Sequence, residues 1–319
     1  MRICSFGETL IDFTPVGTSK NGNVIFERNP GGAPANLAVA AVKQGVEASF
    51  VGEVGDDLFG HFLKDKLEQE GVNTDYMVVN ARYRTTLAFV DLDSNGERSF
   101  CFYRNPGADT MIESQSVDLE CIDQCDIFHY GSVSMSKNPS RITTFELIKV
   151  AKQKGKILSF DPNLRLPLWN DAEEARQEIL QGMEYCDILK VSEEELQFVT
   201  DETDLEKGAR QLFEKYRIPL ILITEGKNGC HALFRNFYIN SDGYTVDVED
   251  TTGAGDAFLG SFLASVLKAG KSLQEFNGDE IYKMLCLANA SAALSVTRKG
   301  GIPSLVTTAQ AEELMQKEH

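Results

Sequence analysis

Short apolar segments alternate with longer amphipathic segments along most of the chain. The short segments have the length of buried strands, and the longer ones repeat their apolar residues at helical spacing. This alternation predicts an α/β fold in which helices cover both faces of a mainly parallel sheet. The expected strands are Arg2–Phe6, Ser49–Gly52, Ile127–Gly131, Ile157–Asp161, Asp187–Val191 and Leu220–Thr224. The expected helices are Pro34–Gln44, Leu58–Glu70, Ser140–Lys154, Ala172–Tyr185, Leu205–Tyr216 and Ala254–Leu267.

Extended segments interrupt this alternation in two places. Thr85–Leu92 and Glu97–Arg104 are rich in strand-forming residues, and residues 93–96 (DSNG) between them are typical of a hairpin turn. A further extended segment, Asp12–Phe26, lies between the first strand and the first helix. Together these segments predict a small antiparallel sheet that projects from the main domain. Such a sheet is either a surface feature without a role or a lid over an active site.

The charge balance bears on the kind of partner. Lys and Arg number 31 against 48 Asp and Glu, so the net charge is 31 − 48 = −17. A field of this sign repels nucleic acid and anionic membranes. The sequence also has no apolar run near the ~20 residues that span a bilayer, and its N-terminal residues read as a strand rather than a signal peptide. We therefore expect a cytoplasmic protein with no nucleic-acid or membrane partner.

The seven cysteines are scattered along the chain, and several of them lie within apolar segments. This arrangement is typical of buried free thiols in a reducing compartment. The alternative is that Cys121 and Cys125, with His129 nearby, form a metal site, although the spacing of the two cysteines is wide for a metal site.

Residues 250–256 (DTTGAGD) are the most informative segment for chemistry. They follow a short expected strand, Thr245–Val248, and they open the helix that begins at Ala254. Because Gly253, Ala254 and Gly255 are small, an anion can approach their N–H groups, and the helix dipole favours a phosphate there. Asp256 in the first turn either stabilises the helix end or removes a proton from an incoming hydroxyl group. The residues alone favour neither interpretation.

A second glycine-containing turn precedes the helix at Pro34–Gln44. Gly31 and Gly32 permit close approach of a ligand, and Asn36 offers it a donor and an acceptor; a plain turn followed by a proline explains the pattern equally well. Residues 51–60 are also rich in glycine, but they are not a G-x-G-x-x-G run that opens a helix, so dinucleotide binding is not supported. The sequence contains no Walker A run, which excludes the P-loop class.

These two glycine-containing segments resemble the motifs of the PfkB, or ribokinase-like, carbohydrate kinases. Residues 250–258 (DTTGAGDAF) look like the C-terminal motif of that family, and residues 31–60 look like its N-terminal motif. Within the family the chain most resembles fructokinases. The stretches that carry this resemblance are residues 7–13 (GETLIDF), 102–107 (FYRNPG), 128–132 (FHYGS), 159–169 (SFDPNLRLPLW) and 190–196 (KVSEEEL).

The resemblance implies a ribokinase-like three-layer α/β/α fold with a small β-sheet lid. The lid would comprise a segment at residues 12–30 and a hairpin at residues 85–108. The kinase domain would comprise the first strand at residues 1–11, residues 31–84, and residues 109–319 with the nucleotide site.

The resemblance also implies roles for individual residues around the sugar. Asp256 is similar to the base of the family, and Gly253, Ala254 and Gly255 match the anion hole for the transferred phosphoryl group. Arg104 matches a lid arginine, and strand alternation puts it on one face with Phe100 and Phe102; its alternative is a solvated charge at a sheet edge. The remaining positions that match the sugar site are Asp12, Gly31, Gly32, Asn36, Asn163 and Arg165.

Further matches concern the nucleotide and metal ions. Lys190, Thr224, Gly226 and Gly229 correspond to nucleotide-contacting positions, as do Gly253 and Gly255, and Asn289 to one near the adenine. Glu195 corresponds to a residue that holds water around Mg²⁺, although Ser192 replaces the asparagine that many members carry three positions earlier. The residues that resemble a loop for a monovalent cation such as K⁺ are Asp250, Thr252, Ser295 and Gly300.

The function implied by this resemblance is ATP-dependent phosphorylation of D-fructose at its 6-hydroxyl group, giving fructose 6-phosphate. One alternative is a kinase for another sugar such as ribose, for a sugar acid such as 2-keto-3-deoxygluconate, or for a nucleoside. The other is a regulatory protein without catalysis. The expected ligands are the sugar and ATP with Mg²⁺. Two copies of the chain are expected to form a homodimer through the lid.

Overall fold

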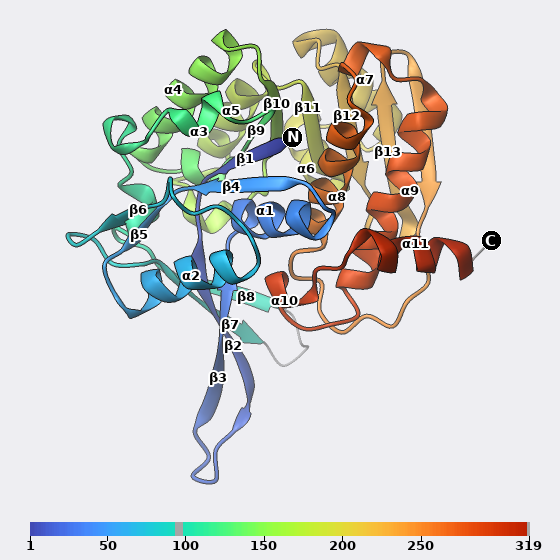
Figure 1. Ribbon diagram of the computed structural model, residues 1–319. Coiled ribbons are helices and arrows are strands. Elements are labelled where there is room, and N and C mark those ends of the chain that lie inside the picture. The colour runs from blue at the N-terminus through green and yellow to red at the C-terminus, as the bar shows by residue number, and fades with distance from the viewer. Residues whose placement is uncertain (93–97, 318–319) are drawn as a thin grey trace.

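The protein folds as three layers, with helices on both faces of a central sheet (Figure 1). The computed structural model describes residues 1–92 and 98–317, and the side chains of residues 91–100 lie outside that description. In this part of the chain the central sheet has eight strands in the order β14-β13-β12-β11-β10-β9-β1-β4. The six strands from β4 to β12 along this order are parallel to one another, and β13 is antiparallel to both of its neighbours, β12 and β14. Their bounds are β1 Arg2–Phe6, β4 Glu47–Val51, β9 Ile127–Gly131, β10 Ile157–Asp161, β11 Ile188–Ser192, β12 Leu220–Thr224, β13 Gly229–Phe234 and β14 Phe237–Asp242.

Alternation along each strand produces two hydrophobic cores, one on each face of the sheet. In β1, Ile3 belongs to one core and Cys4 to the other. The first core contains α1 Ala33–Lys43, α2 Leu58–Gln69, α8 Ala254–Ala269 and α9 Gly278–Ser295, and α10 Gly301–Ser304 and α11 Thr308–Lys317 pack beside α9. The second core contains α3 Glu120–Asp123, α4 Ser140–Gln153, α5 Ala172–Met183, α6 Glu193–Thr200 and α7 Leu205–Tyr216. The α/β fold class with three layers is therefore confirmed.

The strands and helices expected for the main sheet all form, each within two residues of its predicted ends. The short strand expected at Thr245–Val248 is wrong, because those residues have no regular structure. They leave the edge of the sheet after β14 and line a cavity instead, and Val248 is 62% exposed. A strand-like sequence without a neighbouring strand has no partner for its backbone hydrogen bonds.

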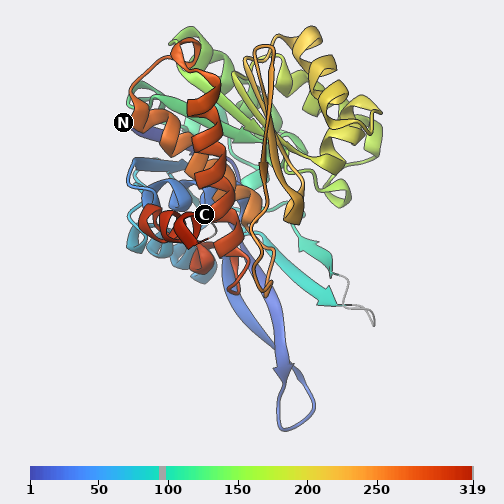
Figure 2. The same ribbon diagram turned by 90° about the vertical axis from the view of Figure 1, so that its right-hand side faces the viewer.

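A second sheet of four strands, in the order β3-β2-β7-β8, projects from the main domain on one side (Figure 2). Its strands are β2 Leu10–Thr18, β3 Val24–Gly31, β7 Leu87–Leu92 and β8 Arg98–Tyr103. The antiparallel hairpin β7–β8 was expected, whereas the expected extended segment Asp12–Phe26 is divided between β2 and β3, which form a second hairpin; β2 and β7 pair in parallel. The expectation of a purely antiparallel sheet is therefore wrong, because both hairpins leave the main domain in the same direction. The turn predicted at residues 93–96 lies outside the described residues.

The register of this second sheet gives each face its character. Asp12 is the register partner of Ala88, and Ala88 is the partner of Phe102, so these three side chains share one face. That face is directed toward the main domain, where Asp12 and Phe102 line a cavity. The opposite face carries Phe13 and Phe89, whose rings stack with centroids 4.9 Å apart.

A short parallel pair, β5 Glu53–Gly55 and β6 Val78–Asn80, lies beside the main sheet. Across residues 1–92 and 98–317, no helix combines the length and the apolar character needed to cross a membrane.

Candidate active site

Two adjoining cavities lie at the edge of the sheet where the parallel strands end. The first has a volume of about 490 Å³ and the second about 560 Å³. Thr251, Ala254 and Gly255 line both of them, so the N-terminal end of α8 is their common rim. A ligand in one cavity can thus reach a ligand in the other across this rim.

Most of the residues predicted for a site line one of these cavities. The first cavity brings together Asp12, Gly32, Asn36, Phe102, Asn163, Arg165, Lys190, Glu195, Thr252, Gly253, Ala254, Gly255 and Asp256. The second brings together Thr224, Gly226, Gly229, Ala254, Gly255 and Asn289. The prediction for the side chain of Phe100 falls outside the described residues.

The rim between the cavities is built from backbone. Gly253 immediately precedes α8 with φ of +80°, a conformation that other residues rarely adopt. The first N–H groups of a helix have no acceptor within the helix, and glycine supplies no side chain to cap them. The N–H of Ala254 donates to Thr251 O at 3.3 Å, and the other N–H groups at this end of α8 are available to an anion, which the helix dipole also favours.

Asp256 lies in the first turn of α8 and is only 5% exposed. Its Oδ2 accepts a hydrogen bond of 2.8 Å from Nδ2 of Asn36, which projects from α1. Burial raises the pKa of Asp256 to about 7, while the Asn36 hydrogen bond, Lys190 and Arg165 act to lower it and Asp161 to raise it. A carboxylate with a pKa near neutrality is suited to accept and release a proton.

Asp12 and Gly31 are diagonal neighbours in the β2–β3 hairpin, where Asp12 pairs with Asn29 and Gly31 pairs with Leu10. Gly31 is adjacent to the carboxyl group of Asp12, and a Cβ atom at position 31 would lie 2.0 Å from Asp12 Oδ2. The residue must therefore be glycine for Asp12 to keep its place at the cavity. Burial raises the pKa of Asp12 to about 7, and Arg165 opposes that shift. Gly31 thus supports the cavity from behind rather than lining it.

A buried ion pair stands beside the rim. Lys190 Nζ lies 3.1 Å from Asp161 Oδ2, and both side chains are less than a tenth exposed. Burial alone would lower the pKa of Lys190, but Asp161 and Glu195 raise it above its usual value, so the ammonium group stays charged. The result is a fixed positive charge within reach of an anion at the tip of α8.

Glu195 caps its own helix and also holds the loop after β10. One carboxylate oxygen accepts from Ser192 N at 2.8 Å, and the other accepts from Leu164 N at 2.7 Å. Burial raises the pKa of Glu195, and Lys190 opposes that shift. Ser192, the departure from the usual family pattern, closes the capping box with its hydroxyl group.

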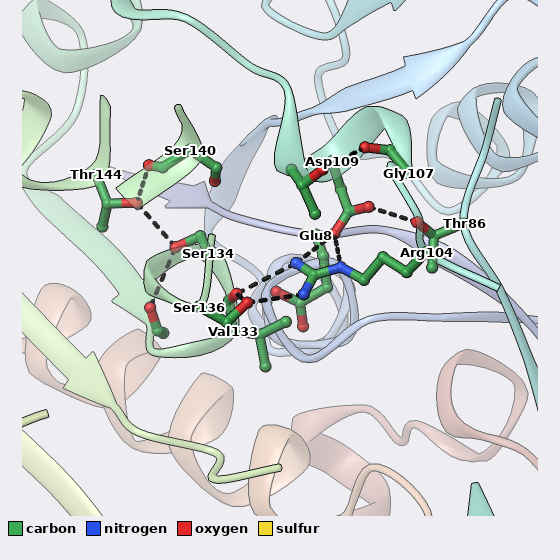
Figure 3. Close-up of polar contacts among 12 residues, drawn as sticks. Glu8, Thr86, Arg104, Gly107, Asp109, Val133, Ser134, Ser136, Ser140 and Thr144 are labelled. Carbon is green, nitrogen blue, oxygen red and sulfur yellow. Dashed lines mark hydrogen bonds and ion pairs between the residues drawn. The ribbon is translucent and has the colours of Figure 1, made fainter. Parts of the chain in front are cut away.

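Arg104 differs from its expected position. It follows the last residue of β8, and its guanidinium is directed toward Asp109, Ser136 and Val133 (Figure 3); Arg104 is not among the described residues that line either cavity. The Nε atom donates to Asp109 Oδ2 at 2.7 Å, and the side chain is 5% exposed. Further bonds go to Ser136 Oγ at 2.8 Å and to the Val133 carbonyl at 3.2 Å. Arg104 is thus a buried anchor behind the cavity wall rather than a solvated edge charge.

The residues predicted for a monovalent cation lie on loops that Asp250 ties together. Its Oδ1 accepts from the N–H and the hydroxyl group of Thr252, and its Oδ2 accepts from Gly300 N at 3.0 Å. The N–H of Asp250 reaches Val296 O at 3.1 Å, one residue beyond Ser295. These contacts hold the segments around Asp250, Val296 and Gly300 together.

Sequence reasoning missed two acidic residues of this site. Asp161 was counted only as the end of a strand, yet it pairs with Lys190 and also accepts from Asn163 N at 3.1 Å. Glu8 lines the first cavity and is buried. The signal for Asp161 was its place at the carboxyl end of a parallel strand, where ligands bind in such folds.

Comparison with known proteins gives a consistent family. The sequence profile described as "pfkB family carbohydrate kinase" matches residues 1–308. Fructokinase-2 of Oryza sativa subsp. japonica is 42% identical, with 99% of this chain and 94% of that protein covered.

Two solved structures share the fold over nearly their whole length. The fructokinase of Xylella fastidiosa with bound ATP superposes with a TM-score of 0.89 at 33% identity, covering 99% of this chain and 98% of that one. A double mutant of the Vibrio cholerae O395 fructokinase, with fructose, ADP and potassium ion bound, has a TM-score of 0.88 at 33% identity and covers 98% and 97%. The chain belongs to the pfkB family of carbohydrate kinases.

Proposed function

We propose that this protein is an ATP-dependent fructokinase, which transfers the terminal phosphoryl group of ATP to the 6-hydroxyl group of D-fructose. One observation carries the proposal: the Asp256 carboxylate lies at a helix end that forms the rim between two cavities. The similar proteins, named as fructokinases and in two cases holding ATP or fructose with ADP, support this choice of substrates.

The reaction requires a base, an anion site and exclusion of water. The 6-hydroxyl oxygen attacks the γ-phosphorus, its proton passes to Asp256, and the bond to the β-phosphate oxygen breaks so that ADP leaves with the electron pair. The N–H groups at residues 253–255 and the Lys190 ammonium stabilise the charge on the transferred group. In this scheme Asp12, Gly32, Asn36, Phe102, Asn163 and Arg165 surround the sugar.

The second cavity is the proposed nucleotide site. It is lined by apolar residues with a few polar groups, as expected for a base and ribose. Thr224, Gly226 and Gly229 are proposed to contact the nucleotide, with Asn289 near the adenine. The side-chain amide of Asn289 donates to Asp242 O at 2.7 Å, which fixes its orientation.

The positions of these residues divide the chain into a lid and a kinase domain. Residues 12–30 and 85–108 are proposed to form the lid, and the remaining residues, 1–11, 31–84 and 109–319, to form the kinase domain. Arg104 anchors the lid through Asp109 and Ser136, close to the sugar but without a direct contact in this arrangement.

Metal ions fit this site in a limited way. The described residues contain no group of three or more His, Cys, Asp or Glu that could hold a metal ion by themselves, and Mg²⁺ in kinases is held largely by water and phosphates. Glu195 is proposed to hold such water, since each of its oxygens keeps a lone pair beyond its one N–H contact. When bound, Mg²⁺ neutralises charge on the phosphate oxygens. K⁺ is proposed for the loops around Asp250, Thr252, Ser295 and Gly300.

The compartment and the assembly are also proposals. Six of the seven cysteines are buried and all seven are free, which supports a reducing compartment such as the cytoplasm. The outer face of the lid sheet exposes Phe26 at 40% and Tyr103 at 65%, and both rings contact Phe89. We expect a second copy of this chain to cover these rings, giving a homodimer.

A coupled assay of ADP release tests the proposal. Fructose, glucose, ribose and adenosine are offered with Mg-ATP, and phosphorus NMR identifies the phosphorylated carbon of the product. We expect fructose to give the highest kcat/KM and a 6-phosphate product. A preference for another acceptor would refute the assignment to fructose, and ADP release that no acceptor stimulates would refute kinase activity.

A further inference from the structure

Glu8 is a buried acid for which the proposed reaction supplies no role. It follows β1, lines the first cavity and is 4% exposed. Glutamate is rarely buried unless it is paired. The contacts of its two carboxylate oxygens therefore need an explanation.

One of these oxygens has a structural role. Oε1 accepts a hydrogen bond of 3.1 Å from the N–H of Ala33, the first residue of α1. This N–H group has no acceptor within the helix, and Gly32 at the cap position has no side chain that could cap the first turn. Glu8 thus caps α1 from a distant part of the chain.

The other oxygen, Oε2, is shielded from solvent and has no hydrogen-bond partner among the described residues. A buried carboxylate oxygen without a donor is unfavourable, and native structures leave few of them. Its cavity is one in which a polyhydroxylated ligand is expected. A hydroxyl group of that ligand is a donor of the right kind.

The neighbouring cation does not satisfy this oxygen. Burial raises the pKa of Glu8 to about 7, while its own backbone N–H and the charge of Arg104 act to lower it. The donors of Arg104 are directed to Asp109, Ser136 and Val133, as Figure 3 shows beside Glu8. Arg104 therefore stabilises charge near Glu8 but leaves Oε2 without a donor.

Helix α1 fixes where Glu8 stands relative to the reacting group. Glu8 binds the N–H of Ala33, and Asn36, three residues later on the same face, binds Asp256. Three residues of helix advance by about 4.5 Å. Glu8 and Asp256 are thus successive acids along one wall of the cavity, and a hexose with its 6-hydroxyl group at Asp256 has room to extend toward Glu8.

We infer that Glu8 is a substrate-binding residue whose Oε2 accepts a hydrogen bond from a hydroxyl group on C1 or C2 of the sugar, the end remote from the phosphorylated carbon. This inference rests on the proposed function, because it takes the 6-hydroxyl group to be at Asp256. A sugar that lacks the remote hydroxyl group would leave Oε2 unsatisfied, so Glu8 would discriminate against it.

The first test substitutes the acid without removing the helix cap. Glu8→Gln retains an oxygen for Ala33 N but presents an amide N–H₂ where Oε2 stood, so the acceptor is lost. We expect KM for fructose to rise about tenfold or more, with KM for ATP unchanged and the melting temperature not lowered. An unchanged KM for fructose in a folded variant would overturn the inference.

Glu53→Gln is the matched control. Glu53 is 2% exposed, its pKa is likewise raised by burial to about 7, and its Oε1 accepts from Asn80 at 2.8 Å, but it lies outside the cavity wall. If Glu53→Gln raised KM for fructose as much as Glu8→Gln does, the effect would be structural and the inference would fail.

The second test keeps the wild-type chain and changes the sugar. Fructose is compared with 1-deoxy-D-fructose and with 2,5-anhydro-D-mannitol, which lacks the 2-hydroxyl group. We expect one of these analogues to have a kcat/KM at least tenfold below that of fructose with the wild type. With Glu8→Gln, where the contact is already lost, the same analogue and fructose should differ little in kcat/KM. Equal losses in both proteins would overturn the inference, as would a wild type that accepts both analogues as well as fructose. A wild type that is inactive on fructose but active on another sugar would contradict the proposed function, and Glu8→Gln is then judged by its KM for that sugar.

Discussion

At the residue scale, Asp256 combines burial, a hydrogen bond from Asn36 and a place at the tip of α8. Substitution by asparagine keeps the size and one acceptor but removes the base. We expect Asp256→Asn to fold and to bind both substrates, while kcat falls by roughly 10²–10⁴-fold. Steady-state kinetics with calorimetric binding of fructose and nucleotide measure this, and a variant within a few-fold of wild-type kcat would exclude Asp256 as the base.

The same carboxyl group sets an expected pH dependence. Its pKa is about 7, and catalysis requires the ionised form, so kcat should fall toward low pH with a midpoint near 7. Asp12, also with a pKa of about 7, can steepen the fall of kcat/KM for the sugar if its charged form binds. Rates at saturating ATP between pH 5.5 and 9 test this, and a flat profile between pH 6 and 8 would contradict it.

The same carboxyl group should also make stability depend on pH, but here the protonated form is the favourable one. The pKa of Asp256 is higher in the folded chain, about 7, than in an unfolded one, about 4. The folded state therefore binds the proton more tightly, and the free energy of unfolding falls as pH rises from about 4 to 7. We expect Asp256→Asn to melt about 2 °C or more above wild type at pH 8 and closer to it at pH 5. A variant that melts below wild type at pH 8 would disprove this.

The residues of the site could be found from sequence only where they stand in a local motif. Asp256 and the preceding glycines lie in one such segment, and Asp12 and Asn36 in others. Glu8 and Asp161 escaped because their importance arises from distant partners, Ala33 N and Lys190 Nζ, that no local pattern reveals. Arg104 follows the end of β8, so strand alternation does not fix its direction, and its pairing with Asp109 depends on how the lid meets the main domain.

At the element scale, the contact between α1 and α8 holds the two halves of the site together. Asn36 lies on α1 and Asp256 on α8, and the helices approach closely at Gly260, where a Cβ atom would lie 2.6 Å from the Cβ of Ala40. The sugar site therefore depends on a small residue one turn beyond the base.

We expect Gly260→Val to force these helices apart. Overpacking of this kind costs about 1–3 kcal/mol, so the melting temperature should fall, and KM for fructose should rise because Asn36 and Asp256 separate. Gly278→Ala at the start of α9 is the control, since a Cβ atom there would meet only Ile239, at 3.8 Å. Equal melting temperatures for the two variants would refute the role of this contact.

The elements that could be predicted are those whose apolar pattern alone indicates a strand or a helix, without knowledge of neighbouring elements. Strands such as β9 and β12 are short, mainly apolar segments, and their predicted ends match the structure. Helix α9 went unpredicted although Ile281, Leu285 and Ala288 repeat at helical spacing. The expected strand at residues 245–248 failed for the reverse reason: strand formation there required a neighbour, and sequence does not show which neighbours a segment will have.

At the scale of the whole molecule, the exposed rings of the lid bear on assembly. We expect the protein to sediment with twice its monomer mass of 35.3 kDa, and Phe26→Glu with Tyr103→Glu to give monomers, because charge on the outer lid face opposes its burial. Phe237→Glu is the control, since Phe237 is a 60% exposed ring on the main domain. A wild type that is monomeric at micromolar concentration would rule out the lid dimer.

The common rim of the two cavities constrains the order of events in a turnover. Among the described residues the two cavities share Thr251, Ala254 and Gly255 and otherwise have separate walls, so there is room for both ligands at once. The enzyme should therefore form a ternary complex and show intersecting rather than parallel double-reciprocal lines. A bisubstrate compound, with fructose joined to adenosine through a phosphate chain long enough to cross the rim, would engage both halves at once and gain from the effective concentration of the second half.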